Sequence, residues 1–258
     1  MKVYDVVKAV EKIAPPELCA AWDNSGFLVG DENADVQKAY ICLDVVHSTV
    51  DDAVKNGCNL IVAHHPVLFS GIKKITADDP TGSVLLKLIG NKINVVAAHT
   101  NFDSSEMGVN YVLATAMGLS SIKKMNDEPD NPSYIGSFDN CLTGWELAEK
   151  IKSVLGINIV RAAGLDLQKK YKTVAVCGGS GTDLWSSALQ AGAEALISAD
   201  GKHHVGLEAE AAGIAVFDGG HFHTENISMK YLERYLNDIL PDLPTVLSKI
   251  DTCPWKNY

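Results

Sequence analysis

The stretch 38–65, KAYICLDVVHSTVDDAVKNGCNLIVAHH, decides the fold of this chain. Its first apolar run, 38–44, predicts a strand, 48–57 predicts a helix that ends at Gly57, and 59–63 predicts a second strand. A strand, a helix and a strand in this order are typical of two parallel strands joined by a crossover helix. The second strand ends on His64 and His65.

The same alternation continues on both sides of this stretch. The capping box Thr143-x-x-Glu146 marks the start of a helix in the second half. Further strands are predicted at 93–98, 157–161, 173–177, 194–198 and 213–217, and further helices near 81–90, before Gly192, near 204–212 and from about 225. The pattern predicts an α/β protein with two similar three-layer lobes and mainly parallel sheets. Residues 1–125 and 126–258 are the expected lobes, with 222–258 packing back onto the first.

The two halves are related in sequence. When 42–65 is aligned with 177–200 without gaps, a cysteine, an alanine and a glycine are identical in the two segments. These identities fall where a strand, a helix and a helix-ending glycine recur. A slightly different offset places His99-x-x-x-Asp103 over His221-x-x-x-Glu225. The stretch 119–140, rich in Ser, Asn, Asp and Pro, is the expected hinge between the lobes.

Composition narrows the function classes. A formal net charge of -10 disfavours nucleic acid and anionic membrane as partners. The six cysteines form no C-x-x-C pair, and several lie in apolar runs, which indicates buried thiols in a reducing compartment. The N-terminus alternates apolar and charged residues and has no signal-peptide core, so a cytoplasmic location is expected.

Histidines gather at predicted strand ends, where α/β proteins carry their functional groups. His64 and His65 point to opposite sides of an extended backbone, so each can give one nitrogen to a different metal ion. His221 and Glu225 share a helix face if the last helix begins early, and Asp103 follows a strand of the other lobe. These five residues predict a site for two divalent cations in the cleft between the lobes, with a carboxylate bridging them.

Each of these histidines has a plainer interpretation, in which it only caps a strand or bonds to nearby backbone. For one histidine that interpretation is preferred, whereas three at strand ends beside carboxylates favour a metal. His99 fits a ligand, a proton carrier or an orienting partner, and the last is favoured. The turn 200–204 with Lys202 and His204 fits a substrate contact or a polar turn equally well. The glycine-rich 178–181 fits a tight strand-to-helix turn better than a phosphate cradle.

Seven segments together resemble the Nif-three-like family, also called type 2 GTP cyclohydrolase I. They are Trp22–Gly30, Leu43-Asp44, His64-His65-Pro66, Ala98–Asp103, Gly178–Gly181, Ser198–Asp200 with His204, and Gly220–Glu225. The resemblance spans nearly the whole chain and implies the short bacterial form, without the domain that longer members insert between the lobes. It departs at Ser198-Ala199, where the family more often has Thr-Gly.

The resemblance implies a ligand set as well as a fold. His64 and Asp103 would hold one ion, His65 and His221 the other, and Glu225 would bridge them. It also implies a ring-shaped homohexamer whose sites face an internal cavity. Zinc, iron, manganese and nickel all suit such ligands.

The function expected from these features is metal-dependent hydrolysis of a nucleotide-like or other phosphate-bearing small molecule, with GTP cyclohydrolase activity as the case that the resemblance implies. His99 and His204 are the candidate catalytic acids. The alternative is a protein that holds metal without turnover, as a chaperone, a regulator or an assembly scaffold. No membrane partner is expected, and nucleic acid is disfavoured.

Overall fold

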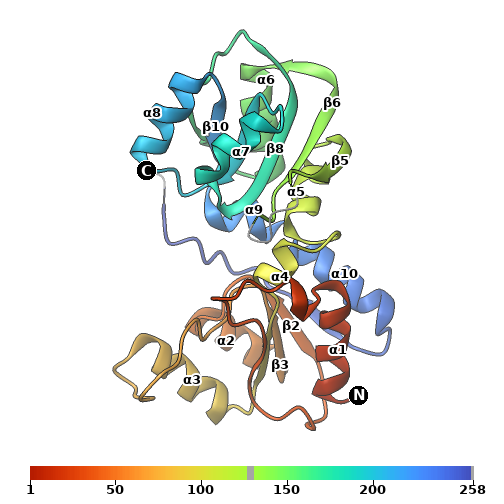
Figure 1. The fold of residues 1–258 in the computed structure, drawn as a ribbon. Helices are drawn as coiled ribbons and strands as arrows, with labels where there is room; N and C mark the ends of the chain where they lie inside the picture. Colours follow the sequence, from red (N-terminus) through yellow and green to blue (C-terminus); the bar gives the residue numbers. More distant parts are fainter. Residues whose placement is uncertain (127–130, 257–258) are drawn as a thin grey trace. The chain divides into compact units, whose positions relative to one another are not determined.

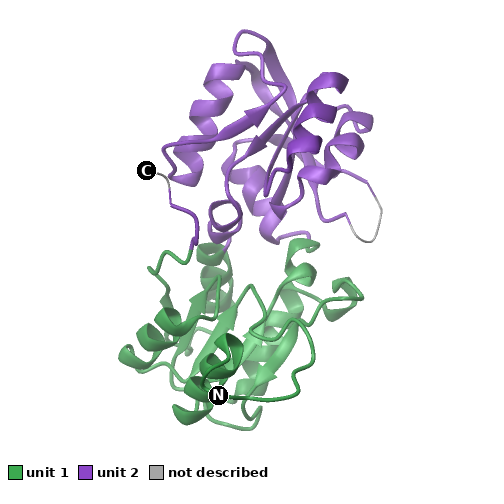
Figure 2. Cartoon of the chain, turned by 90° about the vertical axis from the view of Figure 1, so that its left-hand side faces the viewer, with its two compact units in different colours: residues 1–105, 229–252 green, residues 106–228, 253–258 purple. Residues whose placement is uncertain are grey.

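The computed structural model describes residues 1–126 and 131–256, and they form two units (Figures 1 and 2). The first unit comprises Met1–Ser105 and Met229–Thr252, and the second comprises Glu106–Ser228 and Cys253–Tyr258. Each unit has its own sheet and its own buried core.

The first unit is built on a five-stranded sheet in the order β1-β4-β3-β2-β11. The four strands from β4 to β11 run parallel, and β1 lies antiparallel to β4 at the edge. Cys42 pairs with Ala63, and Ala63 with Ala97, so three neighbouring strands end in register. The strands are β1 (Gly26–Val29), β2 (Ala39–Cys42), β3 (Leu60–Ala63), β4 (Asn94–Ala97) and β11 (Thr245–Leu247).

Helices cover the first sheet on both faces, which is why β2, β3 and β4 are buried along their whole length. Tyr40, Ile61 and Val95 pack in one core with side chains of α2 and α3. On the other side α1 contacts α10, and α10 also contacts β2. The helices are α1 (Val3–Ile13), η1 (Pro16–Leu18), α2 (His47–Lys55), α3 (Pro80–Gly90), α4 (Thr100–Asp103) and α10 (Met229–Ile239).

The second unit has a six-stranded sheet in the order β5-β6-β8-β9-β10-β7. Parallel pairing joins β8 to β9 and β9 to β10, whereas β5, β6 and β7 pair antiparallel with their neighbours. This sheet is therefore mixed, and the expectation of mainly parallel strands holds only for the first unit. The strands are β5 (Ser120–Lys124), β6 (Tyr134–Thr143), β7 (Arg161–Ala163), β8 (Lys170–Ser180), β9 (Ala195–Ala199) and β10 (Ala215–Asp218).

Alternate residues of β8 enter two different cores, so this sheet too lies between two helical layers. Val174 and Val176 belong to one core, and Ala175 and Cys177 to the other. The predicted capping box is confirmed at the start of α6, where the Glu146 N–H donates to Thr143 Oγ1 over 3.3 Å. The helices are α5 (Val109–Ala116), α6 (Gly144–Leu155), η2 (Thr182–Leu184), α7 (Trp185–Gln190), α8 (His203–Ala212) and α9 (His221–Asn226).

Several segments differ from the sequence-based prediction. The strand predicted at 157–161 is wrong in its bounds, because the strand is β7 at Arg161–Ala163. The polar stretch 119–140 contains β5 and much of β6, which pair with each other, so its described residues are part of the second sheet; 127–130 lie outside the described residues. The compact units accordingly change between Ser105 and Glu106 and not at residue 125. The glycine-rich 178–181 is not a simple strand-to-helix turn, because β8 continues through Ser180.

The sequence relation between the halves is repeated in the folded chain. Adding 135 to the bounds of β3 gives residues 195–198, which lie in β9, and adding it to α2 gives 182–190, the span of η2 and α7. Each unit has three consecutive parallel strands, with an antiparallel strand beside the third. Within residues 1–126 and 131–256, no helix combines the length and apolar character needed to cross a membrane.

Candidate metal centre

Three imidazoles meet where β3 and β4 end. His64 and His65 directly follow β3, and His99 stands between β4 and α4. Because the two strands are parallel neighbours that end in register, their following residues lie at the same edge of the sheet. The ring centroid of His64 lies 4.9 Å from that of His65 and 5.2 Å from that of His99. One ligand atom from each of the three lies within 4.8 Å of the others, a spacing that could hold a metal ion.

Each of these imidazoles has its Nδ1 fixed by an acceptor. His64 Nδ1 lies 2.7 Å from the Ala98 carbonyl oxygen, which can only accept, so this nitrogen carries the hydrogen. His65 Nδ1 lies 2.7 Å from Asp44 Oδ1. In both rings the neutral tautomer then presents Nε2 as the ligating nitrogen, which is the usual arrangement around a protein-bound metal.

His99 is oriented by Asp23, whose Oδ1 lies 2.8 Å from His99 Nδ1. Asp23 also accepts hydrogen bonds from the Thr100 hydroxyl over 2.6 Å and the Ser25 hydroxyl over 2.9 Å. Burial on its own would raise the pKa of Asp23, but the hydrogen bonds from His99 and Thr100 outweigh it and hold this pKa far below its usual range. Asp23 therefore stays ionised and can accept a hydrogen bond from Nδ1 of His99.

Asp103 lies one turn after His99, at the end of α4. Its Oδ1 is 3.6 Å from Nε2 of His64, the nitrogen that the Ala98 carbonyl leaves for a ligand. The first unit thus brings together four of the side chains that the sequence singled out, His64, His65, His99 and Asp103. Imidazole nitrogens and carboxylate oxygens at these spacings suit a divalent transition metal.

The second unit carries a histidine and a glutamate on one short helix. α9 begins at His221, earlier than the predicted start near 225, so His221 and Glu225 share a face with Nε2 and Oε2 3.2 Å apart. His221 Nδ1 lies 2.7 Å from Asp200 Oδ2. The hydrogen bond to Glu225 raises the pKa of His221 to about 9, against an opposing effect of burial and with a further contribution from Asp200.

Gly179 makes room for the Glu225 carboxylate. Its φ is +64°, and a Cβ added there would lie 2.1 Å from Glu225 Oε1 and 3.2 Å from His221 Nε2. A side chain at 179 would be strained and would also displace the carboxylate. This close approach, rather than a phosphate cradle, explains the glycine of the GGSG segment, and Glu225 is only 4% exposed beneath it.

Three orienting carboxylates were not given a role by sequence reasoning, namely Asp23, Asp44 and Asp200. Two of them, Asp44 and Asp200, occupy comparable positions, each at the end of a strand next to the strand that precedes a histidine. Asp44 comes after β2 and contacts the histidine after β3, and Asp200 comes after β9 and contacts the histidine after β10. An acidic residue at the end of the neighbouring parallel strand was the signal that could have identified them.

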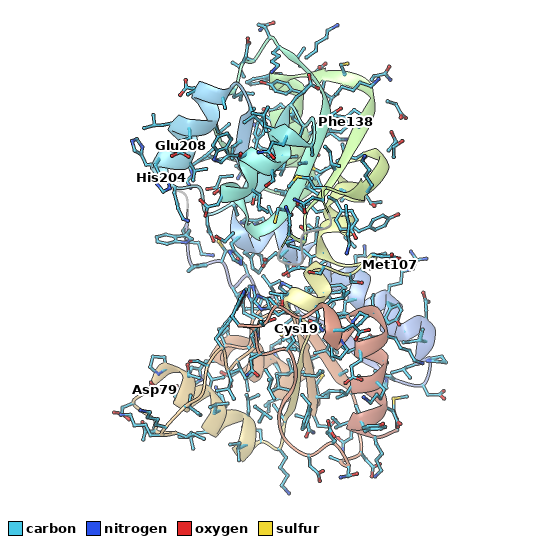
Figure 3. All side chains as sticks on the ribbon, in the orientation of Figure 1. Cys19, Asp79, Met107, Phe138, His204 and Glu208 are labelled. Carbon is cyan, nitrogen blue, oxygen red and sulfur yellow. The ribbon has the colours of Figure 1, made fainter. Side chains whose placement is uncertain are left out.

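The remaining predicted residue, His204, lies elsewhere on the second unit. It is exposed on the first turn of α8 and is labelled in Figure 3. Lys202, just before it, forms an ion pair with Asp183. Among the described residues, the groups of ligand atoms close enough to hold a metal do not include His204, so its catalytic role stays a prediction.

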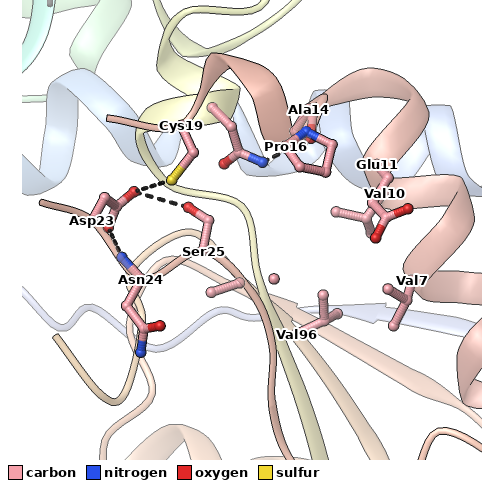
Figure 4. Close-up of a pocket in the computed structure, with 13 residues that line it drawn as sticks. Val7, Val10, Glu11, Ala14, Pro16, Cys19, Asp23, Asn24, Ser25 and Val96 are labelled. Carbon is pink, nitrogen blue, oxygen red and sulfur yellow. Dashed lines mark hydrogen bonds between the residues drawn. The ribbon is translucent and has the colours of Figure 1, made fainter. Parts of the chain in front are cut away.

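A pocket of about 230 Å³ lies beside Asp23 in the first unit (Figure 4). Val7 and Val10 of α1, with Ala14 just after this helix, form its apolar side, and Cys19 and Ser25 lie at its polar side. Figure 4 shows both polar side chains directed toward Asp23, to which they donate hydrogen bonds. Its polar side is therefore engaged in holding Asp23.

The fold and these side chains define a class, a two-unit α/β protein with histidine and carboxylate groups that could hold divalent metal. The chain belongs to the Duf34/NIF3 (NGG1p interacting factor 3) family, whose sequence model matches residues 1–254. The resemblance seen in the sequence is thereby confirmed.

Relatives in sequence and in structure match along almost the full length. A Clostridium acetobutylicum protein named GTP cyclohydrolase 1 type 2 homolog is 35% identical over 99% of this chain and 98% of its own. A Streptomyces coelicolor protein of the same name is 33% identical over 98% and 93%. The crystal structure of Staphylococcus aureus hypothetical protein SA1388 has a TM-score of 0.93 at 28% identity, covering 100% of this chain and 99% of that one. Reduced HcgD from Methanocaldococcus jannaschii has a TM-score of 0.84 at 27% identity, covering 97% and 98%.

Proposed function

We propose that this protein is a metal-dependent hydrolase with two divalent cations held jointly by the two units. His64 and Asp103 would hold one ion, His65 and His221 the other, and Glu225 would bridge them. The incomplete donor set of the second unit supports this assignment. One imidazole and one carboxylate, His221 and Glu225, fall short of the three or four protein ligands that a zinc-type site uses. The oriented imidazole of His221 and the buried carboxylate of Glu225 have a purpose if further ligands come from the first unit.

The observation that carries the proposal is the common orientation of the four imidazoles His64, His65, His99 and His221. In each, Nδ1 faces an acceptor, at 2.7 Å in three and 2.8 Å in His99. Histidines that only cap strands have no reason to share this arrangement, whereas metal-ligating histidines almost always do.

The relatives named GTP cyclohydrolase 1 type 2 homolog support a nucleotide-like substrate. Divalent ions at this site would supply a nucleophile from water near neutral pH and polarise the group under attack. His99 is the better candidate for moving a proton, because Asp23 holds its Nδ1 and so directs Nε2 away from that contact. His204 remains a second candidate, without a comparable partner.

The test combines elemental analysis with a substrate panel that includes GTP. Purified protein is expected to contain two divalent ions per chain and to lose turnover when they are removed, with recovery on re-addition. His65→Ala should abolish turnover and keep the fold, judged by circular dichroism. His47→Ala is the matched control. His47 is an exposed histidine of α2 whose hydrogen-bond partner is Ser83 of α3, and it is not one of the proposed metal ligands.

Two outcomes would contradict the hydrolase proposal. Undiminished turnover in metal-depleted protein would exclude a metal-dependent reaction. Retention of metal at full stoichiometry with no consumption of any compound on the panel would favour the alternative, a protein that holds metal as a chaperone, regulator or scaffold.

The assembly and location proposed here follow the family resemblance and the thiol chemistry. We propose a homohexameric ring, which light scattering of the purified protein would test; a monomeric mass would contradict it. The six cysteines form no disulfide, which supports a reducing compartment such as the cytoplasm.

A further inference from the structure

Two large aromatic side chains of the first unit are exposed beside His99. Trp22 is 67% exposed and Phe69 is 55% exposed. Each contacts the same imidazole edge-on: the Trp22 ring centroid lies 6.0 Å from that of His99 at an interplanar angle of 78°, and the Phe69 centroid lies 5.6 Å away at 88°. Residues far apart in sequence thus place two exposed aromatic rings on one histidine of the candidate metal centre.

Hydrogen bonds hold the two segments that carry these rings. The Asn24 side chain donates to the Leu68 carbonyl oxygen over 2.6 Å, which ties the segment of Trp22 to the residue just before Phe69. Asp23, between Trp22 and Asn24, is bonded to His99. Both rings therefore have a defined place relative to His99.

Exposure of these rings calls for a physical reason. Full burial of a side chain such as Phe would stabilise the folded state by about 1.5–3 kcal/mol. Both aromatic side chains stay largely exposed, so neither provides most of this stabilisation. Scattered exposed apolar residues need no explanation, but large ones gathered beside polar groups mark a binding site. A flat ring with apolar faces and polar edges is the ligand that fits aromatic side chains next to an imidazole.

We infer that Trp22 and Phe69 form a stacking site for a planar nitrogen heterocycle in the substrate and so determine its specificity. This inference rests on the proposed function, because it assigns to the substrate of the same site a flat ring that lies next to His99. Aromatic side chains stack on flat rings and not on phosphate groups, so the two residues would select for the ring of the substrate.

The test is a binding measurement by calorimetry on the metal-loaded, full-length protein, and it requires no turnover. The probes are guanosine 5′-monophosphate, which carries the ring, and ribose 5-phosphate, which lacks it. Trp22→Leu and Phe69→Leu should each weaken binding of the nucleotide roughly tenfold, the effect typical of losing one base–aromatic stack, and leave ribose 5-phosphate unchanged. Trp22→Phe should restore most of the affinity. Trp145→Leu, a change of an exposed tryptophan in the second unit, should have no effect.

Three results would overturn the inference. They are equal binding of both probes by the wild-type protein, an unchanged preference for the ring in the two leucine variants, and weaker binding of both probes alike in these variants. If the variants keep the ring preference but change the molar mass in light scattering, the rings serve a contact between copies. Loss of the ring preference with metal-dependent turnover intact on another substrate would confirm the stacking site independently of the GTP assignment, whereas turnover without metal would contradict the proposed function alone.

Discussion

The first unit carries β2, β3 and β4 as parallel neighbours, and the second carries β8, β9 and β10 in the same arrangement, yet the residues after these strands differ. At the offset of 135, His65 corresponds to Asp200 and Asp44 to Gly179. In the first unit the pair Asp44–His65 presents an imidazole, whereas in the second Asp200 orients His221 and Gly179 leaves space for Glu225. The residues that follow equivalent strands can thus have different roles. In one unit they are an imidazole and the carboxylate that orients it, and in the other a glycine leaves space for a side chain of a later helix.

The comparison teaches that the two units carry complementary kinds of side chain at these positions. The first has three clustered imidazoles, and the second has one imidazole beside a buried carboxylate. A duplicated fold whose copies had kept identical residues would hold two identical sites. The copies have diverged in the groups that follow their strands, as the proposed metal site requires.

The largest expected effect comes from removing one ligand in each unit. His64→Ala and His221→Ala should each lower metal affinity by more than the roughly 10–100-fold that loss of an orienting partner causes. Mass-spectrometric metal analysis after dialysis against a weak chelator measures it. If only His64→Ala loses metal, the first unit binds its ion alone and the complementarity of the units is wrong.

A substitution at Gly179 should separate backbone strain from carboxylate displacement. Gly179→Ala and Gly156→Ala both place alanine at a left-handed φ, +64° and +66°, and each should lower the free energy of unfolding by about 1–2 kcal/mol. Only the Cβ at 179 would clash, because nothing lies within 4 Å of one added at 156. Gly179→Ala should therefore be the less stable variant in urea unfolding and should also bind metal more weakly. Equal stability and equal metal affinity would contradict a special role for Gly179.

A smaller effect is expected from the orienting carboxylates. Asp44→Asn and Asp200→Asn keep the side-chain shape but remove the charge that supports His65 and His221, so metal affinity should fall about 10–100-fold in each. Competition with a fluorescent chelator measures this change. Asp51→Asn is the control, because Asp51 forms an exposed ion pair with Lys87. Wild-type affinity in both variants would mean that these carboxylates do not support metal ligands.

The smallest effect concerns pH and the metal-depleted protein. The hydrogen bond that His221 donates to Glu225 raises the pKa of His221 from 6.5 to about 9, so the protonated imidazole stabilises the folded state. This contribution is full below pH 6.5 and is lost as the pH rises through about 9. As the pH rises between these values, the melting temperature should fall more in the wild type than in His221→Gln. The difference should be small, because the His221 side chain is 37% exposed and solvent screens its charge. Identical pH profiles would contradict the pairing of His221 with Glu225.

Much of the fold was accessible from the sequence because buried parallel strands leave clear apolar runs. Leu60–Ala63 and Ala195–Ala199 are apolar or small throughout and buried throughout, and both were placed correctly. β5 was missed because its residues Ser120–Lys124 are mostly exposed and polar, as suits an edge strand. Strand direction in the second sheet was missed because antiparallel pairing of β6 with β8 leaves no mark on periodicity.

The ligand candidates could be predicted, but their supporting contacts could not. His64, His65 and His221 stand at strand or helix ends that the apolar pattern locates. The partnership of Asp23 with His99 joins residues 76 positions apart, and no spacing rule encodes it. Gly179 has its role because a glutamate from a later helix packs against it. Such contacts are set by the tertiary fold.

Anomalous diffraction from crystals of the metal-loaded protein tests most directly whether the two units share their ions. The account predicts two anomalous peaks about 3.5–4 Å apart, with His64 and His65 of the first unit and His221 and Glu225 of the second among the ligands. One peak bound by His64, His65 and His99, with His221 and Glu225 away from it, would contradict the account.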